Sequence, residues 1–119
     1  MNCVECHMGE SNESGDLGGH TWKPNLASER CLKCHSDINS IIDTKKAEID
    51  VLMATVADKL VTAGAMTFDG AEYHPIIGFV PTATFEALWN YLMVYEDQSH
   101  GMHNYEYAKA LLNDANAKL

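Results

Sequence analysis

Two copies of one five-residue pattern, Cys-x-x-Cys-His, use all four cysteines of the chain. The first copy is CVECH at 3–7 and the second is CLKCH at 31–35. Three chemistries use a Cys-x-x-Cys pair: a redox or structural disulfide, a zinc site closed by four thiolates, and covalent attachment of c-type haem. A thioredoxin-like redox pair accompanies a βαβ pattern, and this sequence shows no such pattern. Zinc and haem are therefore the readings to be separated.

The histidine after each pair separates them. Six of the 119 residues are His, so chance places His after both pairs in roughly one case in 400, the square of 6/119. A zinc knuckle has no need of these histidines, whereas haem c needs both as axial ligands. Cysteines three apart share a helical turn and reach two vinyl groups of one porphyrin, with the next residue directed toward the iron. The spacing favours two covalently bound c-type haems over zinc or a disulfide. Thioether bonds are expected at Cys3, Cys6, Cys31 and Cys34, and proximal iron ligands at His7 and His35.

The other four histidines are candidates for the distal side of the irons: His20, His74, His100 and His103. A second imidazole gives an electron carrier of lower potential, a Met thioether raises the potential, and an open position gives a binding or catalytic site. Because free histidines outnumber the two positions to fill, we expect bis-His ligation.

Local sequence ranks these histidines. His103 lies between Gly101, which allows a tight backbone approach, and Asn104, an expected helix N-cap, so it is expected to be well held. His20 follows two glycines in a polar loop and is expected to be a distal ligand. His74 precedes a proline in a loop and is a further candidate. His100 is expected to be exposed, and an exposed polar histidine is the alternative interpretation of each.

Composition bounds the class of protein. A length of 119 residues suits one compact domain, and 46% hydrophobic residues exclude a disordered chain. A net charge of −9 without a basic stripe argues against nucleic acid binding and suits partners with basic patches. No apolar run is long enough to span a membrane. Because haem c is attached outside the bacterial inner membrane, we expect a periplasmic or extracellular protein whose leader has been removed.

The chain changes character after the second motif. Residues 1–36 are polar and glycine-rich and are expected to form a dihaem-binding segment in which the porphyrins supply the apolar mass. Residues 37–119 are expected to be helical, and the two parts to form one compact domain overall. Apolar residues between Ile38 and Val61 recur every three or four positions, which predicts an amphipathic helix. Ser36 or Asp37 caps it and Gly64 ends it, giving about 27 residues, or about 40 Å.

The remaining elements follow from glycine, proline and apolar spacing. Residues 65–81 are expected to form a loop, and a second helix to run from about 82 to 98. Its expected apolar face is Phe85, Leu88, Trp89, Leu92 and Met93. The fold class is therefore mainly α: a haem-packed N-terminal segment, a long antiparallel helical hairpin and a short C-terminal helix after Asn104.

Several stretches together resemble a known family: CVECHM, GGHTWKP, CLKCHS and, after the long helices, SHGMHNYEYAKALL. In this order they are similar to the C-terminal two-haem part of the pentahaem cytochrome c nitrite reductases and related multihaem cytochromes. The resemblance implies that His103 is the distal ligand of the haem held by the first motif, here haem one. It also implies that His20 ligates a different haem. The family's long C-terminal helices form a dimer contact, which implies the same for the stripe from Ile38 to Val61.

The resemblance also has gaps. The family's ligand for its last haem lies before the first of these motifs, so haem two, held by the second motif, must take His20, His74 or another chain's histidine, or stay open. The family's catalytic haem and active-site residues lie upstream and have no counterpart here, so we expect no catalytic residue and no nitrite reduction by this chain.

Two functions follow. The first is electron transfer by a dihaem cytochrome, alone or within a larger multihaem assembly, with redox proteins, other haem-bearing chains or a second copy as partners. The alternative is a small redox enzyme with haem two open to nitrite, hydroxylamine or peroxide and with His74 or His100 as proton donor.

Overall fold

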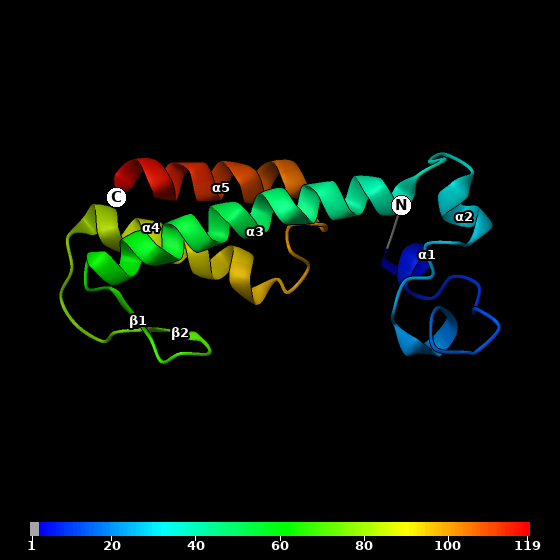
Figure 1. The fold of residues 1–119 in the computed structure, drawn as a ribbon, viewed down its shortest axis with the longest axis horizontal. Helices are drawn as coiled ribbons and strands as arrows, with labels where there is room; N and C mark the ends of the chain where they lie inside the picture. The colour runs from blue at the N-terminus through cyan, green and yellow to red at the C-terminus, as the bar shows by residue number, and fades with distance from the viewer. Residues whose placement is uncertain (1–2) are drawn as a thin grey trace. The chain divides into compact units, whose positions relative to one another are not determined.

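The computed structural model describes residues 3–119 and is mainly helical, as predicted (Figure 1). The chain divides into two compact units, Met1–Asp43 and Thr44–Leu119, called here the N-terminal and C-terminal units. The division falls inside the long helix α3 (Ile38–Thr62).

The N-terminal unit contains only short helices: α1 (Cys3–His7), the 3-10 helix η1 (Gly19–Thr21) and α2 (Glu29–Leu32). Hydrogen bonds hold the connecting loop against the residues that follow α1. The Gly19 N–H donates to Gly9 O at 2.8 Å, and the Asn25 side chain donates to Glu10 O at 2.9 Å. Gly18 has φ +75°, and a Cβ there would lie 2.2 Å from Glu10 O. Only glycine therefore allows this close approach.

Helix α3 begins and ends where the sequence predicted. The Asp37 carboxylate accepts the Ser40 N–H at 3.2 Å, which is an N-cap interaction. At the other end Gly64 has φ +72°, and the N–H of Ala65 donates to Leu60 O at 2.9 Å, closing the helix on a left-handed residue. In the described part of the chain no helix is long and apolar enough to cross a membrane.

The segment after α3 is not simply a loop, and that prediction was wrong. Strands β1 (Met66–Phe68) and β2 (Tyr73–Pro75) pair antiparallel, with Thr67 opposite His74. The Asp69 carboxylate shapes the turn by accepting the N–H groups of Ala71 at 2.8 Å and Glu72 at 2.9 Å. Strands of three residues are too short to show the alternation that identifies a strand in sequence.

Helices α4 (Thr82–Glu96) and α5 (Tyr105–Lys118) complete the C-terminal unit. In Figure 1, α4 runs antiparallel to both α3 and α5. The backbones of α4 and α5 approach most closely, so the principal hairpin joins these two helices rather than α3 and α4 as predicted. With 14 residues, α5 is nearly as long as α4 with 15, and it is not the short helix expected. The core lies between all three helices and includes Ile49, Val56, Leu60, Leu88, Tyr91, Val94 and Leu112.

The predicted apolar face of α4 was largely wrong. Phe85, Trp89 and Met93 are 55%, 58% and 47% exposed. The buried face instead carries Ala87 and Tyr91, with Leu88 and Val94 beside them. The small side chain of Ala87 lets neighbouring helices come close, because the distance between packed helices is set by the side chains at the contact.

The apolar stripe of α3 is used inside the chain over its second half. Ile49, Val56 and Leu60 are fully buried in the C-terminal unit, and Leu52 and Met53 pack against the same core. A dimer contact through the long helices stays a prediction from the resemblance.

Candidate haem-binding sites

The first motif lies entirely within α1. Cys3 is exposed, while Cys6 and His7 are half-buried. His7 Nδ1 lies 2.6 Å from the backbone oxygen of Trp22. A carbonyl oxygen only accepts hydrogen bonds, so Nδ1 must carry the proton and the lone pair lies on Nε2. A histidine held through Nδ1 by a backbone carbonyl is the usual arrangement of a metal-ligating imidazole, so this geometry fits a proximal haem ligand.

The second motif begins in α2 and continues into the turn after it. Cys31 is half-buried, and the Ser28 hydroxyl lies 3.7 Å from its Sγ. Cys34 and His35 are exposed, and the His35 N–H donates to Cys31 O at 3.1 Å. Cα atoms of α1 and α2 come within 8 Å of each other. The two motifs are therefore neighbours within the N-terminal unit.

The N-terminal unit lacks an apolar core of its own. Among its described residues no hydrophobic side chain is buried, although the C-terminal unit buries a full set. Large apolar side chains stay exposed at and near the motifs: Val4, Leu17, Trp22 and Leu32. Val4 and Leu32 belong to the motifs themselves. Burial of apolar surface is what offsets the entropy cost of ordering a chain, so this unit fits large apolar groups attached at its cysteines.

The cysteines do not converge on a single point. Within residues 3–119, no three His, Cys, Asp or Glu side chains gather closely enough to hold a metal ion, and all four thiols are free. A structural zinc site needs four ligands at about 2.0–2.3 Å. In the described part of the chain the thiols are not gathered into such a site.

His20 lies on η1 and is exposed. The loop that carries it is fixed by two left-handed glycines, Gly18 and Gly19, and a Cβ on Gly19 would lie 2.6 Å from Ser11 Oγ. The histidine thus projects from a constrained backbone, as expected for a ligand, and its role as a distal ligand stays a prediction.

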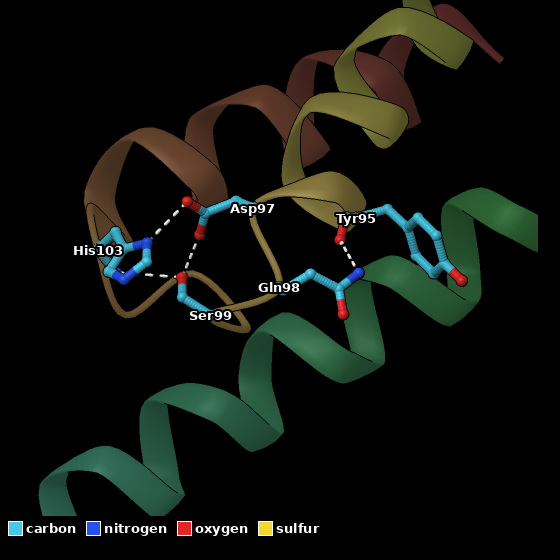
Figure 2. Close-up of polar contacts among 5 residues, drawn as sticks. All are labelled: Tyr95, Asp97, Gln98, Ser99 and His103. Atoms are coloured by element: carbon cyan, nitrogen blue, oxygen red, sulfur yellow. Dashed lines mark hydrogen bonds and ion pairs between the residues drawn. The ribbon is translucent and has the colours of Figure 1, made fainter. Parts of the chain in front are cut away.

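The turn between α4 and α5 holds the other two candidates of the SHGMH stretch. His103 Nδ1 donates to Asp97 Oδ1 at 2.8 Å, and the Ser99 hydroxyl donates to the other oxygen of the same carboxylate (Figure 2). The His103 backbone N–H in turn donates to Ser99 Oγ at 3.1 Å. Desolvation is the largest single influence on the Asp97 carboxyl and raises its pKa, but the hydrogen bonds from Ser99 and His103 together lower that pKa below the ordinary value. The carboxylate is therefore ionised and holds the imidazole with its lone pair on Nε2.

His100 and His74 are held by carboxylates in different ways. His100 Nδ1 lies 2.6 Å from Asp50 Oδ1, and both residues line a cavity of about 320 Å³. His74 instead uses Nε2, which lies 3.0 Å from Asp69 Oδ2. In His74 the lone pair is thus on Nδ1, the ring atom next to the backbone, where a porphyrin meets more steric hindrance. The geometry supports His103 as a distal ligand better than His74.

Sequence reasoning missed the residues that hold these histidines. Asp97 and Ser99 precede His103 in the same turn, so their short polar side chains were the available signal. Asp50 lies fifty residues before His100, so no local pattern indicates this contact. The Trp22 carbonyl is a backbone group, which every residue type has, so it gives no signal in the sequence either.

No protein-family model, curated protein or solved structure matches this chain. The likeness to the multihaem nitrite reductases thus rests on the motifs alone.

Proposed function

We propose that this chain is a dihaem c-type cytochrome that transfers electrons, alone or as a module of a larger multihaem assembly. One observation carries the proposal: two Cys-x-x-Cys-His motifs lie at neighbouring helices, α1 and α2, of a unit whose described residues bury no hydrophobic side chain. Covalent haem supplies both the absent apolar mass and one-electron redox chemistry.

Different residues of the chain would bind the porphyrins and the irons. The four cysteines form the thioether bonds, and His7 and His35 bind the irons on the proximal side. The carbonyl of Trp22 keeps His7 in the tautomer that an iron ligand needs. The resemblance implies that His103 takes the distal side of haem one, and the hydrogen bond between its Nδ1 and Asp97 fits a ligating imidazole.

On the distal side of haem two, the iron takes His20 or a histidine from another haem-bearing chain. The alternative is that this iron stays open, as in the small redox enzyme. The proposal includes no catalytic residue. The setting is the periplasm or the cell exterior, where haem c is attached. A net charge of −9 suits redox partners with basic surfaces, because complementary charge speeds encounter.

The test is a haem count on protein made in cells with the haem c maturation system. The denatured chain should carry two haems that survive acid and organic extraction, because thioether bonds are covalent. Replacing Cys3 and Cys6 by Ala should remove one haem, and replacing Cys31 and Cys34 should remove the other. Leu32→Ala is the matched control, since it alters a variable position of the second motif and keeps Cys31, Cys34 and His35. A colourless chain, or haem lost on denaturation, contradicts the proposal.

A further inference from the structure

The side chains around His103 form a closed set of hydrogen bonds rather than a single contact. Asp97 accepts from His103 with one carboxylate oxygen and from Ser99 with the other. Ser99 also accepts the His103 N–H, so it contacts the ligand candidate and its carboxylate at once. Figure 2 shows these three residues pointing toward one another at the end of α4.

The backbone that carries this set is constrained. Gln98 and His100 have φ of 56° and 52°, a conformation that non-glycine residues rarely adopt. The Gln98 side chain donates to Tyr95 O at 2.9 Å, which ties the turn to α4 (Figure 2). Gly101 packs against Ile49 so closely that a Cβ would lie 3.0 Å from it. The surrounding packing thus holds the turn in this uncommon conformation.

We propose that Asp97 is a positioning residue for His103: with Ser99 it orients the imidazole, and its carboxylate makes Nε2 a stronger donor to the iron of the haem that His103 ligates. The proposal rests on the proposed function, and it adds how the potential of that haem is set. A carboxylate behind a ligating imidazole raises the basicity of the ligand. A more basic ligand stabilises ferric over ferrous iron, so Asp97 lowers the reduction potential of this haem relative to a neutral partner.

The chain offers a matched control on the same turn. Asp50 accepts from His100 Nδ1 at 2.6 Å, which reproduces the chemistry of the Asp97–His103 pair three residues away. The Asp50 side chain is 54% exposed, and it is paired with His100. Replacing Asp50 by Asn removes the same charge from the His100 pair and leaves the Asp97–His103 pair intact, and solvent and salt screen its longer-range effect on the haem.

The experiment is spectroelectrochemical titration of the full haem-loaded protein and its Asp97→Asn, Asp97→Ala, Ser99→Ala and Asp50→Asn variants. Asn at position 97 keeps an acceptor for His103 but loses the charge, so it separates charge from hydrogen bonding. At a fixed potential the reduced-to-oxidised ratio of one haem should rise about tenfold in Asp97→Asn, which is 59 mV for a one-electron couple. Ser99→Ala should shift the same haem less, because it keeps the Asp97 carboxylate, and Asp50→Asn should change neither haem more than about twofold.

Circular dichroism of each variant confirms that it folds, and His103→Ala separates two kinds of failure. If His103→Ala makes one haem high-spin while Asp97→Asn shifts the potential no more than Asp50→Asn, the role of Asp97 is overturned and the ligand assignment stands. If His103→Ala leaves both haems low-spin with unchanged potentials, the ligand assignment fails and the role of Asp97 fails with it. A shift confined to the Asp97 and Ser99 variants, in the haem that responds to His103→Ala, supports the proposal.

Discussion

Replacing Gly101 by Ala should destabilise the protein by about 2–4 kcal/mol. The left-handed backbone at this position and the crowding of the new Cβ both contribute to this loss of stability. Gly101 has φ +78°, and a left-handed backbone costs an L-residue about 1–2 kcal/mol. The added Cβ would also lie 3.0 Å from Ile49 Cγ1 and 3.2 Å from Ala108 Cβ, and overpacking a core costs about 1–3 kcal/mol. The unfolded chain has fewer conformations with Ala than with Gly, and this offsets less than about 1 kcal/mol of the destabilisation.

Gly64→Ala is the matched control. Gly64 has φ +72°, nearly the same backbone, but its Cβ would meet nothing within 4 Å. It should therefore carry the backbone cost alone, about 1 kcal/mol after the entropy term. The difference between the two variants measures the contact with Ile49 and Ala108.

Urea unfolding of the haem-loaded chain, followed by far-ultraviolet circular dichroism, gives both free energies at unchanged m-values. Equal destabilisation by the two variants would show that the turn does not pack against α3 as described. Because Gly101 lies two residues before His103, Gly101→Ala should also increase the high-spin fraction of one haem, whereas Gly64→Ala should not.

Three further predictions address the irons, the β-hairpin and the core. Low-temperature electron paramagnetic resonance of the oxidised protein should show two low-spin ferric signals, and a high-spin signal from about half of the haem would favour the enzyme with an open iron. Hydrogen bonds from the backbone N–H groups of Glu72 and Ala71, and then from His74, lower the pKa of Asp69 from 3.8 to about 2. Because the folded-state pKa is depressed, the ionised Asp69 stabilises the fold above its unfolded pKa, and this stabilisation is lost as the pH falls through about 2. The unfolding free energies of wild type and Asp69→Asn should therefore converge on acidification. A difference that stays constant with pH would contradict this. Leu112→Ala, at a fully buried position, should lower the free energy of unfolding in urea by about 2–5 kcal/mol. Val51→Ala, at a position that is 66% exposed, should change it by less than about 0.5 kcal/mol. Equal effects of the two substitutions would place the core elsewhere.

The helix ends were predictable because they depend on neighbours in the sequence. Asp37 caps α3, and Asn104 caps α5 by accepting the Tyr107 N–H at 3.3 Å. Gly64 ends α3 in the left-handed conformation that its missing Cβ allows. Each of these signals involves residues within four positions, so a single sequence contains all of it.

The buried face of α4 was not predictable in the same way. Large apolar residues at Phe85, Trp89 and Met93 have the spacing of a core stripe, yet they lie outside. The buried side is built around Ala87 and Tyr91, and Tyr91 lines a cavity together with Met53 and Ala57 of α3. Hydropathy ranks side chains by polarity, whereas close packing of helices also selects for small volume, and that depends on a partner helix distant in sequence.

The same division between local and distant signals decides how far the candidate ligands could be ranked. Residue type identified four histidines, but an imidazole binds iron through one nitrogen, and its hydrogen-bond partner fixes which nitrogen carries the lone pair. Asp97 holds His103 through Nδ1, whereas Asp69 holds His74 through Nε2. Only the first arrangement places the lone pair on the outer ring atom, as the Trp22 carbonyl does for His7. His103 and the motif residue His7 are thus both held through Nδ1. This shared geometry is the physical reason to rank His103 above His74 as a candidate iron ligand.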